Sequence, residues 1–163
     1  MGSKLSYGAL FCGADPFEEA WPQGQRVFSC DKLNRPGLVP GRTPDKGVDH
    51  TRYERVCWKR VLDDQPLDLL IVGPIKKLKL RQQWTSDFLD NDSRPQSLLV
   101  VHRPSELLEQ KGTAYKQWTK DLRGFGYTVL TEFVRAAECG AALWEGHFMT
   151  IASLGAPSVP PDL

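Results

Sequence analysis

The segment Leu5–Asp31, LSYGALFCGADPFEEAWPQGQRVFSCD, predicts the start of an α/β fold. Its first part, Ser6–Cys12, is a mostly apolar run of the kind that forms a buried strand. Gly13 follows as a turn residue, Asp15–Trp21 predicts a helix, and Arg26–Cys30 predicts a second strand. A strand, a glycine turn, a helix and a second strand make up the repeating unit of open parallel sheets.

The helix in this segment has recognisable start signals. Asp15 suits the N-cap, Pro16 suits the first helical position, and two glutamates follow in the first turn. Asp31 comes directly after the second predicted strand. Because ligands of open α/β sheets bind outside the carboxyl ends of the strands, Gly13 and Asp31 are candidate ligand-binding residues. A turn that binds nothing is the alternative interpretation of the same residues.

The rest of the chain continues the alternation of strands and helices. Leu67–Pro74 is the clearest strand, because a continuous apolar run predicts burial on both faces of a sheet. Three more strands and three helical segments are predicted. Gly112 is expected to break the last helical segment into two pieces, and the last two strands are expected to form a hairpin-like pair. The further strands are Ser97–Val101, Tyr127–Val134 and His147–Leu154, and the helical segments are His50–Asp63, Ile75–Asp92 and Ser105–Gly124.

This order predicts an α/β fold with a doubly wound, mostly parallel sheet and helices on both faces. We expect residues 1–154 to form one domain and the proline-rich residues 155–163 to form an extended tail. With 163 residues and a formal net charge of +1, the chain is long enough for a sizeable core and has no overall attraction to nucleic acid or to a membrane surface.

The cysteines and histidines indicate neither disulfides nor a metal centre. Cys12, Cys30, Cys57 and Cys139 form no CxxC pair, and His50, His102 and His147 are scattered along the sequence. Reduced thiols and the lack of a long apolar run predict an intracellular protein of a reducing compartment, such as the cytoplasm or nucleus, with an organelle not excluded. No metal cofactor is expected.

The first segment resembles the cofactor-binding start of the S-adenosylmethionine-dependent DNA cytosine methyltransferases, which opens with a Phe-x-Gly-x-Gly turn. Asp15 stands in place of the second glycine, where a carboxylate would crowd the ligand and repel the methionine carboxylate. The resemblance implies S-adenosylmethionine as cofactor and a Rossmann-like methyltransferase sheet with one antiparallel strand near an edge. The cofactor-binding residues that it implies are Phe11, Gly13, Asp31, Asp49 and Pro74.

The resemblance extends over almost the whole chain in order but fails at the positions that carry the chemistry. After its central strand, the family has Pro-Cys, and the cysteine attacks the target base; here the residues are Pro74 and Ile75. A later strand of the family is followed by Glu-Asn-Val, whose glutamate holds the target base; here His102 and Arg103 follow. Isoleucine offers no nucleophile, so cytosine methylation by the family's mechanism is not expected.

The last part of the chain repeats this contrast. Scaffold residues match the family pattern, whereas its Gln-x-Arg-x-Arg motif is replaced by Leu143, Glu145 and His147. The matching scaffold residues are Gly126, Tyr127, Ala137, Gly140 and Phe148.

A basic stretch follows the central strand, at Lys76, Lys77, Lys79 and Arg81. Basic residues beside aromatic ones at a ligand-side loop can contact phosphate, and these four are the candidate nucleic-acid-binding residues. A solvated face of a helix is the alternative interpretation, because charge runs usually have that role. Trp84 and Phe88 are four residues apart, the spacing of one helix face, and we expect them to pack inward.

Three functions remain compatible with the sequence. The first is a degenerate, catalytically inactive methyltransferase-like protein that acts as a structural or interaction module, with a protein partner or a larger assembly. The second is an active S-adenosylmethionine-dependent methyltransferase with a specificity other than cytosine. The third is a nucleic-acid-binding module that uses the basic stretch.

Overall fold

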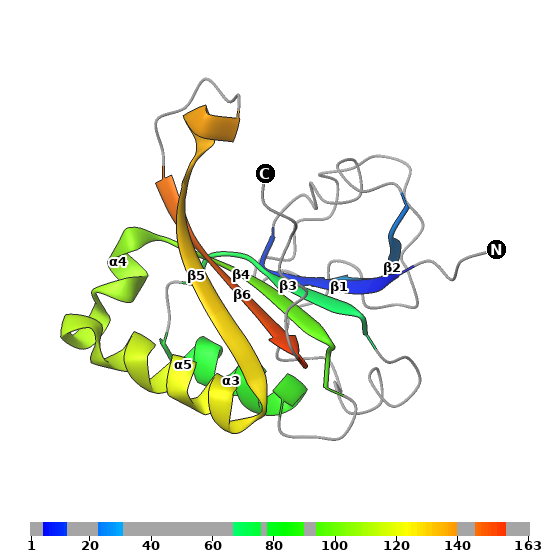
Figure 1. The fold of residues 1–163 in the computed structure, drawn as a ribbon, viewed down its shortest axis with the longest axis horizontal. Coiled ribbons are helices and arrows are strands. Elements are labelled where there is room, and N and C mark those ends of the chain that lie inside the picture. The colour runs from blue at the N-terminus through cyan, green and yellow to red at the C-terminus, as the bar shows by residue number, and fades with distance from the viewer. Residues whose placement is uncertain are drawn as a thin grey trace.

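A six-stranded sheet forms the centre of the fold, with strand order β2-β1-β3-β4-β6-β5 (Figure 1). The structure is a computed structural model and describes residues 5–12, 23–30, 67–75, 78–89, 94–139 and 146–155. The strands are β1 Ser6–Leu10, β2 Gln25–Cys30, β3 Leu69–Val72, β4 Ser97–His102, β5 Tyr127–Arg135 and β6 Gly146–Leu154.

The strand directions agree with the predicted fold class. Strands β2, β1, β3 and β4 pair in parallel, whereas β6 is antiparallel to both β4 and β5. The sheet is therefore mostly parallel, with one antiparallel strand next to the β5 edge. The hairpin-like pairing of the last two strands is confirmed.

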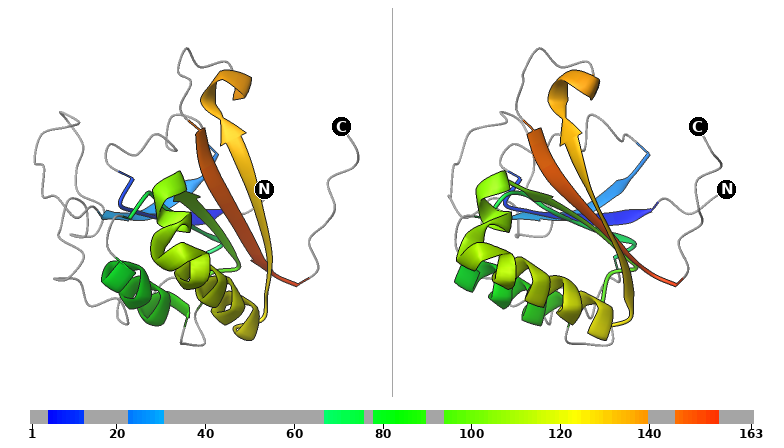
Figure 2. Two further views of the ribbon diagram at one scale, coloured as in Figure 1. Left: turned by 90° about the vertical axis from the view of Figure 1, so that its left-hand side faces the viewer. Right: turned by 60° about the vertical axis from the view of Figure 1, so that its left-hand side comes forward.

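The helices that the structure describes lie on one side of the sheet (Figure 2). They are α3 Leu78–Leu89, α4 Pro104–Leu107 and α5 Thr113–Gly124, with the 3₁₀ turns η2 Glu109–Gly112 and η3 Ala136–Cys139. The helices predicted at Asp15–Trp21 and His50–Asp63 lie outside the described residues.

The break predicted at Gly112 is confirmed. Gln110, Lys111 and Gly112 all have positive φ angles, of 52°, 58° and 81°, and α5 begins at the next residue. The left-handed conformation suits glycine but is unfavourable for the two residues before it. The predicted segment Ser105–Gly124 is therefore a short helix, a 3₁₀ turn and a longer helix.

The main hydrophobic core lies between the sheet and the helices α3 and α5. Trp84 and Phe88 of α3 are fully buried in it, which confirms that this face of the helix points inward. Trp118 and Leu122 of α5 pack into the same core. The hydrophobic spacing along both helices therefore attaches them to the same face of the sheet.

The opposite face of the sheet is also buried at its centre. Tyr7 and Ala9 of β1 and Ile71 of β3 form a second, smaller cluster there. Strand β3 is thus buried on both faces, as its continuous apolar sequence predicts. Within the described residues, no helix is long and apolar enough to cross a membrane.

Candidate functional site

The carboxyl ends of β1 and β3 meet at the edge of the sheet where the sequence places a ligand site. Phe11 follows β1 with a φ angle of 58° and is almost fully buried. The N–H group of Gly73, just after β3, donates to the carbonyl oxygen of Leu10 at 2.8 Å. A β-carbon at position 73 would overlap with the carbonyl group of Phe11, so the two turns approach as closely as only glycine allows.

We expect Gly73→Ala to lower the free energy of unfolding by about 1–3 kcal/mol, because the added methyl group collides with backbone atoms that have no rotamer to change. Gly124→Ala is the matched control: no atom lies within 4 Å of the added methyl group, and the residue is helical. The control should leave stability unchanged or raise it by about 0.5–1 kcal/mol. Urea unfolding measures both, and equal stabilities would contradict the close approach.

The two residues after Gly73 are apolar and well packed. Pro74 is half-buried, and Ile75 is 5% exposed and belongs to the main core. Ile75 occupies the position where the resembled family has its nucleophilic cysteine. The side chain at this position therefore contributes to packing and has no group that could attack a base.

The end of β4 contains a buried histidine. His102 is 1% exposed, and its Nε2 atom lies 3.0 Å from the hydroxyl oxygen of Thr150 on β6. Its ring packs edge-on against Tyr115 and Trp118 of α5, with centroid distances of 5.6 and 5.3 Å. The helix α5 and the strand β6 thus enclose the imidazole from two sides.

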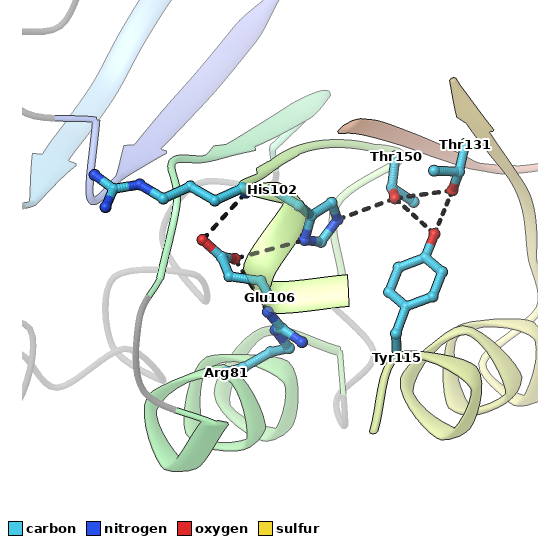
Figure 3. A network of polar contacts seen from close by, with 7 residues as sticks. Arg81, His102, Glu106, Tyr115, Thr131 and Thr150 are labelled. Carbon is cyan, nitrogen blue, oxygen red and sulfur yellow. Dashed lines mark hydrogen bonds and ion pairs between the residues drawn. The ribbon is translucent and has the colours of Figure 1, made fainter. Parts of the chain in front are cut away.

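A buried ion pair lies next to this histidine (Figure 3). The Arg81 guanidinium on α3 donates to the Glu106 carboxylate on α4 at 3.1 Å, and both side chains are at least 95% buried. The other carboxylate oxygen of Glu106 accepts the N–H group of Arg103 at 3.2 Å, which caps α4. Arg81 also lies over the ring of Trp118, 5.9 Å from its centroid. The pair connects two helices beneath the end of β4.

Three hydroxyl groups extend the network towards the sheet edge. The Thr150 hydroxyl lies 2.9 Å from that of Thr131 on β5 and 3.2 Å from that of Tyr115. Tyr115 and Thr131 are also hydrogen-bonded to each other. Together with His102, Arg81 and Glu106, these residues form what we call the buried polar cluster, which joins α3, β4, α4, α5, β5 and β6.

Burial lowers the pKa of His102 below its ordinary value of 6.5. The Glu106 carboxylate, 3.8 Å from Nδ1, acts in the opposite direction, and the Arg81 guanidinium adds to the lowering. Nδ1 itself has no hydrogen-bond partner. The lowered pKa favours the neutral form of this buried imidazole.

The position of Arg81 corrects its assignment to an exposed basic stretch. The side chain is 2% exposed and pairs with Glu106, so it is not available to a phosphate. The reason is that residue 81 lies on the inner side of α3, in line with Trp84 and Phe88. Lys76 and Lys77 lie outside the described residues, and of Lys79 only the backbone is described.

Most of the predicted cofactor-binding residues also fall outside the described part of the chain. These are Gly13, Asp31 and Asp49. The described residues of the edge, Phe11 and Pro74, are apolar and uncharged, and Phe11 is almost fully buried whereas Pro74 is half-buried. Uncharged, apolar residues are compatible with the apolar part of a nucleoside. Binding of S-adenosylmethionine therefore stays a prediction.

Sequence reasoning missed Glu106 and the threonines of the buried polar cluster. The sequence does contain a signal for Glu106, because this glutamate stands three residues after Arg103, the N-cap of α4, as in a capping box. Thr131 and Thr150 lie in alternating strands and have no local signal. Within the described residues, no group of three or more histidine, cysteine or acidic side chains could hold a metal ion.

A cavity of about 530 Å³ lies between α3 and α5, away from the ends of β1 and β3. Its lining combines the charged side chains of Arg81 and Asp121 with the aromatic ring of Trp118. Uncharged polar residues that also line it include Gln82, Ser86, Thr113 and Gln117. This cavity is thus separate from the edge where the sequence predicts a cofactor.

Comparison with solved structures identifies the class of fold. The S. pombe Dnmt2 methyltransferase matches with a TM-score of 0.72 and 15% identity, over 96% of this chain and 51% of its own. A putative DNA modification methyltransferase encoded within an E. coli prophage matches with a TM-score of 0.71 and 16% identity, over 98% and 49%. The Entamoeba histolytica methyltransferase EhMeth gives 0.68 and 9%, over 99% and 57%.

The chain therefore has a methyltransferase-like Rossmann fold and spans about half the length of these similar proteins. No protein-family model matches the sequence, and no curated protein matches it either.

Proposed function

We propose that this chain is a methyltransferase-like module that does not transfer methyl groups and acts as a structural or interaction partner. The observation that supports this most strongly is the buried polar cluster. It fills the end of β4, where the resembled family holds its target base, and within it the opposite charges of Arg81 and Glu106 pair with each other. A base could reach this position only if the cluster were taken apart.

The chemistry of the two altered positions supports the same proposal. Covalent catalysis on cytosine needs a thiolate at position 75 and an acid at the end of β4. Ile75 packs into the core, and the neutral His102 binds Thr150. Neither side chain can take the role of the residue that it replaces, and neither is open to solvent.

A module without activity can still bind a nucleotide-like ligand at the carboxyl ends of β1 and β3, which we call the cofactor edge. S-adenosylmethionine, when bound, supplies an electrophilic methyl group. Phe11, Gly13, Asp31, Asp49 and Pro74 are the residues that we propose would hold it, with the two acids on the hydroxyl groups and adenine.

An active methyltransferase of another specificity is the second candidate. It is favoured by the fold match over nearly the whole chain and by the names of the similar proteins, which include a Dnmt2 methyltransferase and a DNA modification methyltransferase. Contact of nucleic acid with Lys76, Lys77 and Lys79 belongs to this candidate, or to a binding module without activity. Such contact would weaken steeply as the salt concentration rises.

We expect the purified chain to transfer no methyl group to DNA or RNA above the level of a protein-free reaction. Tritium-labelled S-adenosylmethionine provides the readout, with an active DNA cytosine methyltransferase as positive control. The Ile75→Cys variant should remain inactive, because restoring the thiol leaves the buried polar cluster in place. A calorimetric titration with S-adenosylmethionine reports binding independently. Transfer by the wild-type chain that exceeds the blank would refute the proposal.

A further inference from the structure

The cavity between α3 and α5, which we call the α3–α5 cavity, is separate from the cofactor edge and has the size of a ligand site. Its volume of about 530 Å³ lies within the range of about 300–1,000 Å³ that is usual for small-molecule sites. Arg81, Thr85 and Trp118 are the buried members of its lining. Exposed side chains of both helices, such as Gln82 of α3 and Gln117 of α5, complete the lining. A small molecule can therefore enter between two polar walls.

A buried side chain of this lining has an unused hydrogen-bond donor. Arg81 donates to Glu106 through Nη2 at 3.1 Å, whereas its Nη1 atom is buried and has no hydrogen-bond partner within the described part of the chain. A buried donor without an acceptor is unfavourable, so an acceptor on a bound molecule would be stabilised there. Because Nη1 is enclosed, a ligand atom reaches it only when a neighbouring side chain moves aside.

One part of the lining is built on unfavourable backbone. Gln110 lines the cavity with a φ angle of 52°, and Lys111 follows with 58°. Residues other than glycine rarely adopt this left-handed conformation, and it is found most often where a side chain must be presented for function. The carbonyl oxygen of Gln110 accepts the hydroxyl of Thr113, another lining residue, at 2.7 Å. The turn thus places an amide and a hydroxyl in the same lining.

Charge and aromatic exposure narrow the class of ligand. The charge of Arg81 is already balanced by Glu106, and Asp121 is the other charged residue of the described lining, so phosphate or carboxylate groups would be repelled. Trp118 is only 5% exposed and Phe125 is half-buried, which leaves too little ring surface for a flat base to stack on. A neutral ligand with many hydrogen-bonding groups remains.

We propose that the α3–α5 cavity binds a neutral, hydroxyl-rich ligand of the size of a monosaccharide. Amides both donate and accept hydrogen bonds and carboxylates accept them, so such groups recognise neighbouring hydroxyls. Gln117 and Asp121 lie one helical turn apart, and their side chains are joined by a hydrogen bond of 2.7 Å. Gln82 and Ser86 have the same spacing on α3. This inference goes beyond the proposed non-catalytic role and does not depend on it.

Chemical-shift mapping of the nitrogen-15-labelled chain tests the proposal. The probes are glucose and ribose, with adenine and inorganic phosphate as representatives of other ligand classes. Binding is followed through the indole N–H signal of Trp118. The affected variant is Gln82→Ala/Gln117→Ala, which removes one amide from each helix. Gln83→Ala/Lys116→Ala is the matched control, because it changes the same two helices at residues that the described lining does not include. Circular dichroism verifies that both variants keep the fold.

We expect glucose or ribose to bind the wild type and the control equally, with a dissociation constant of about 10 mM or lower. The affinity of Gln82→Ala/Gln117→Ala should be weaker by about fivefold or more, because two hydrogen-bonding groups are lost. Equal affinity for all three proteins, or no shift with either sugar, would overturn the proposal. Binding of adenine or phosphate alone would also overturn it, because the ligand would then belong to another class. The methyl-transfer assay tests the non-catalytic role separately, so either proposal can fail without the other.

Discussion

Replacing Glu106 by glutamine is expected to lower the free energy of unfolding by about 3–5 kcal/mol. The change leaves the Arg81 guanidinium, which is 2% exposed, without its opposite charge in the interior. It also weakens the acceptor of the Arg103 N–H group at the start of α4. Urea unfolding followed by tryptophan fluorescence measures the loss.

Two further variants separate the charge effect from a general sensitivity to mutation. Glu138→Gln breaks the exposed ion pair between Arg135 and Glu138 and should change stability by less than about 0.5 kcal/mol. The double variant Arg81→Met/Glu106→Leu removes both buried charges and should recover much of the loss caused by Glu106→Gln alone. A loss below about 1 kcal/mol for Glu106→Gln would mean that water reaches the pair, against its observed burial.

Trp118→Ala should also cost about 3–5 kcal/mol, because this side chain joins the apolar core to the buried polar cluster. Its ring lies edge-on to Trp84 and to His102, and its indole N–H group donates to the Thr85 hydroxyl at 3.1 Å. Removing it opens a cavity between α3, α5 and the sheet and leaves the guanidinium of Arg81 without its aromatic neighbour.

Trp118→Phe is the matched variant for this position. It keeps an aromatic ring in the core but loses the hydrogen bond to Thr85, so we expect a smaller loss of about 1–2 kcal/mol. Equal losses for the two variants would show that the hydrogen bond, and not the packing of the ring, carries the effect. Urea unfolding with a fluorescence-independent probe, such as far-ultraviolet circular dichroism, avoids the loss of signal from the missing indole.

The sheet could be predicted because its strands are encoded by local apolar runs. The β3 sequence is buried on both faces, and the alternation in β5 and β6 identifies two paired strands. The inward direction of Trp84 and Phe88 follows from helical spacing alone. In each case the signal lies within a few neighbouring residues.

The buried polar cluster could not be predicted, because its partners are distant in the sequence. Arg81 and Glu106 are separated by 25 residues, and His102 and Thr150 by 48. Arg81 follows three lysines, and a run of basic residues usually indicates a solvated surface. Only the packing of α3 against α4 and α5 shows that this one member of the run turns inward, away from the nucleic-acid contact predicted for it.

The cofactor-binding residues predicted at the ends of β1 and β3 stay predictions, because most of them lie outside the described part of the chain. Gly13, Asp31 and Asp49 lie outside the described residues, whereas Phe11 and Gly73 show that the ends of β1 and β3 are in close contact. The close approach of these two strand ends is observed, and the cofactor-binding residues that the sequence places there stay predictions.

Nitrogen-15 NMR of the histidine rings most directly tests whether the end of β4 is a closed structural cluster. The His102 signals are assigned by their loss in His102→Gln and followed as the pH is lowered from about 8 to 5. We predict a neutral imidazole at pH 7 that takes up its proton only below the ordinary value of 6.5, because burial lowers its pKa. A ring that titrates at or above 6.5 would mean that solvent or the Glu106 carboxylate outweighs the effect of burial, and would contradict the neutral, buried His102 on which the proposed non-catalytic function depends.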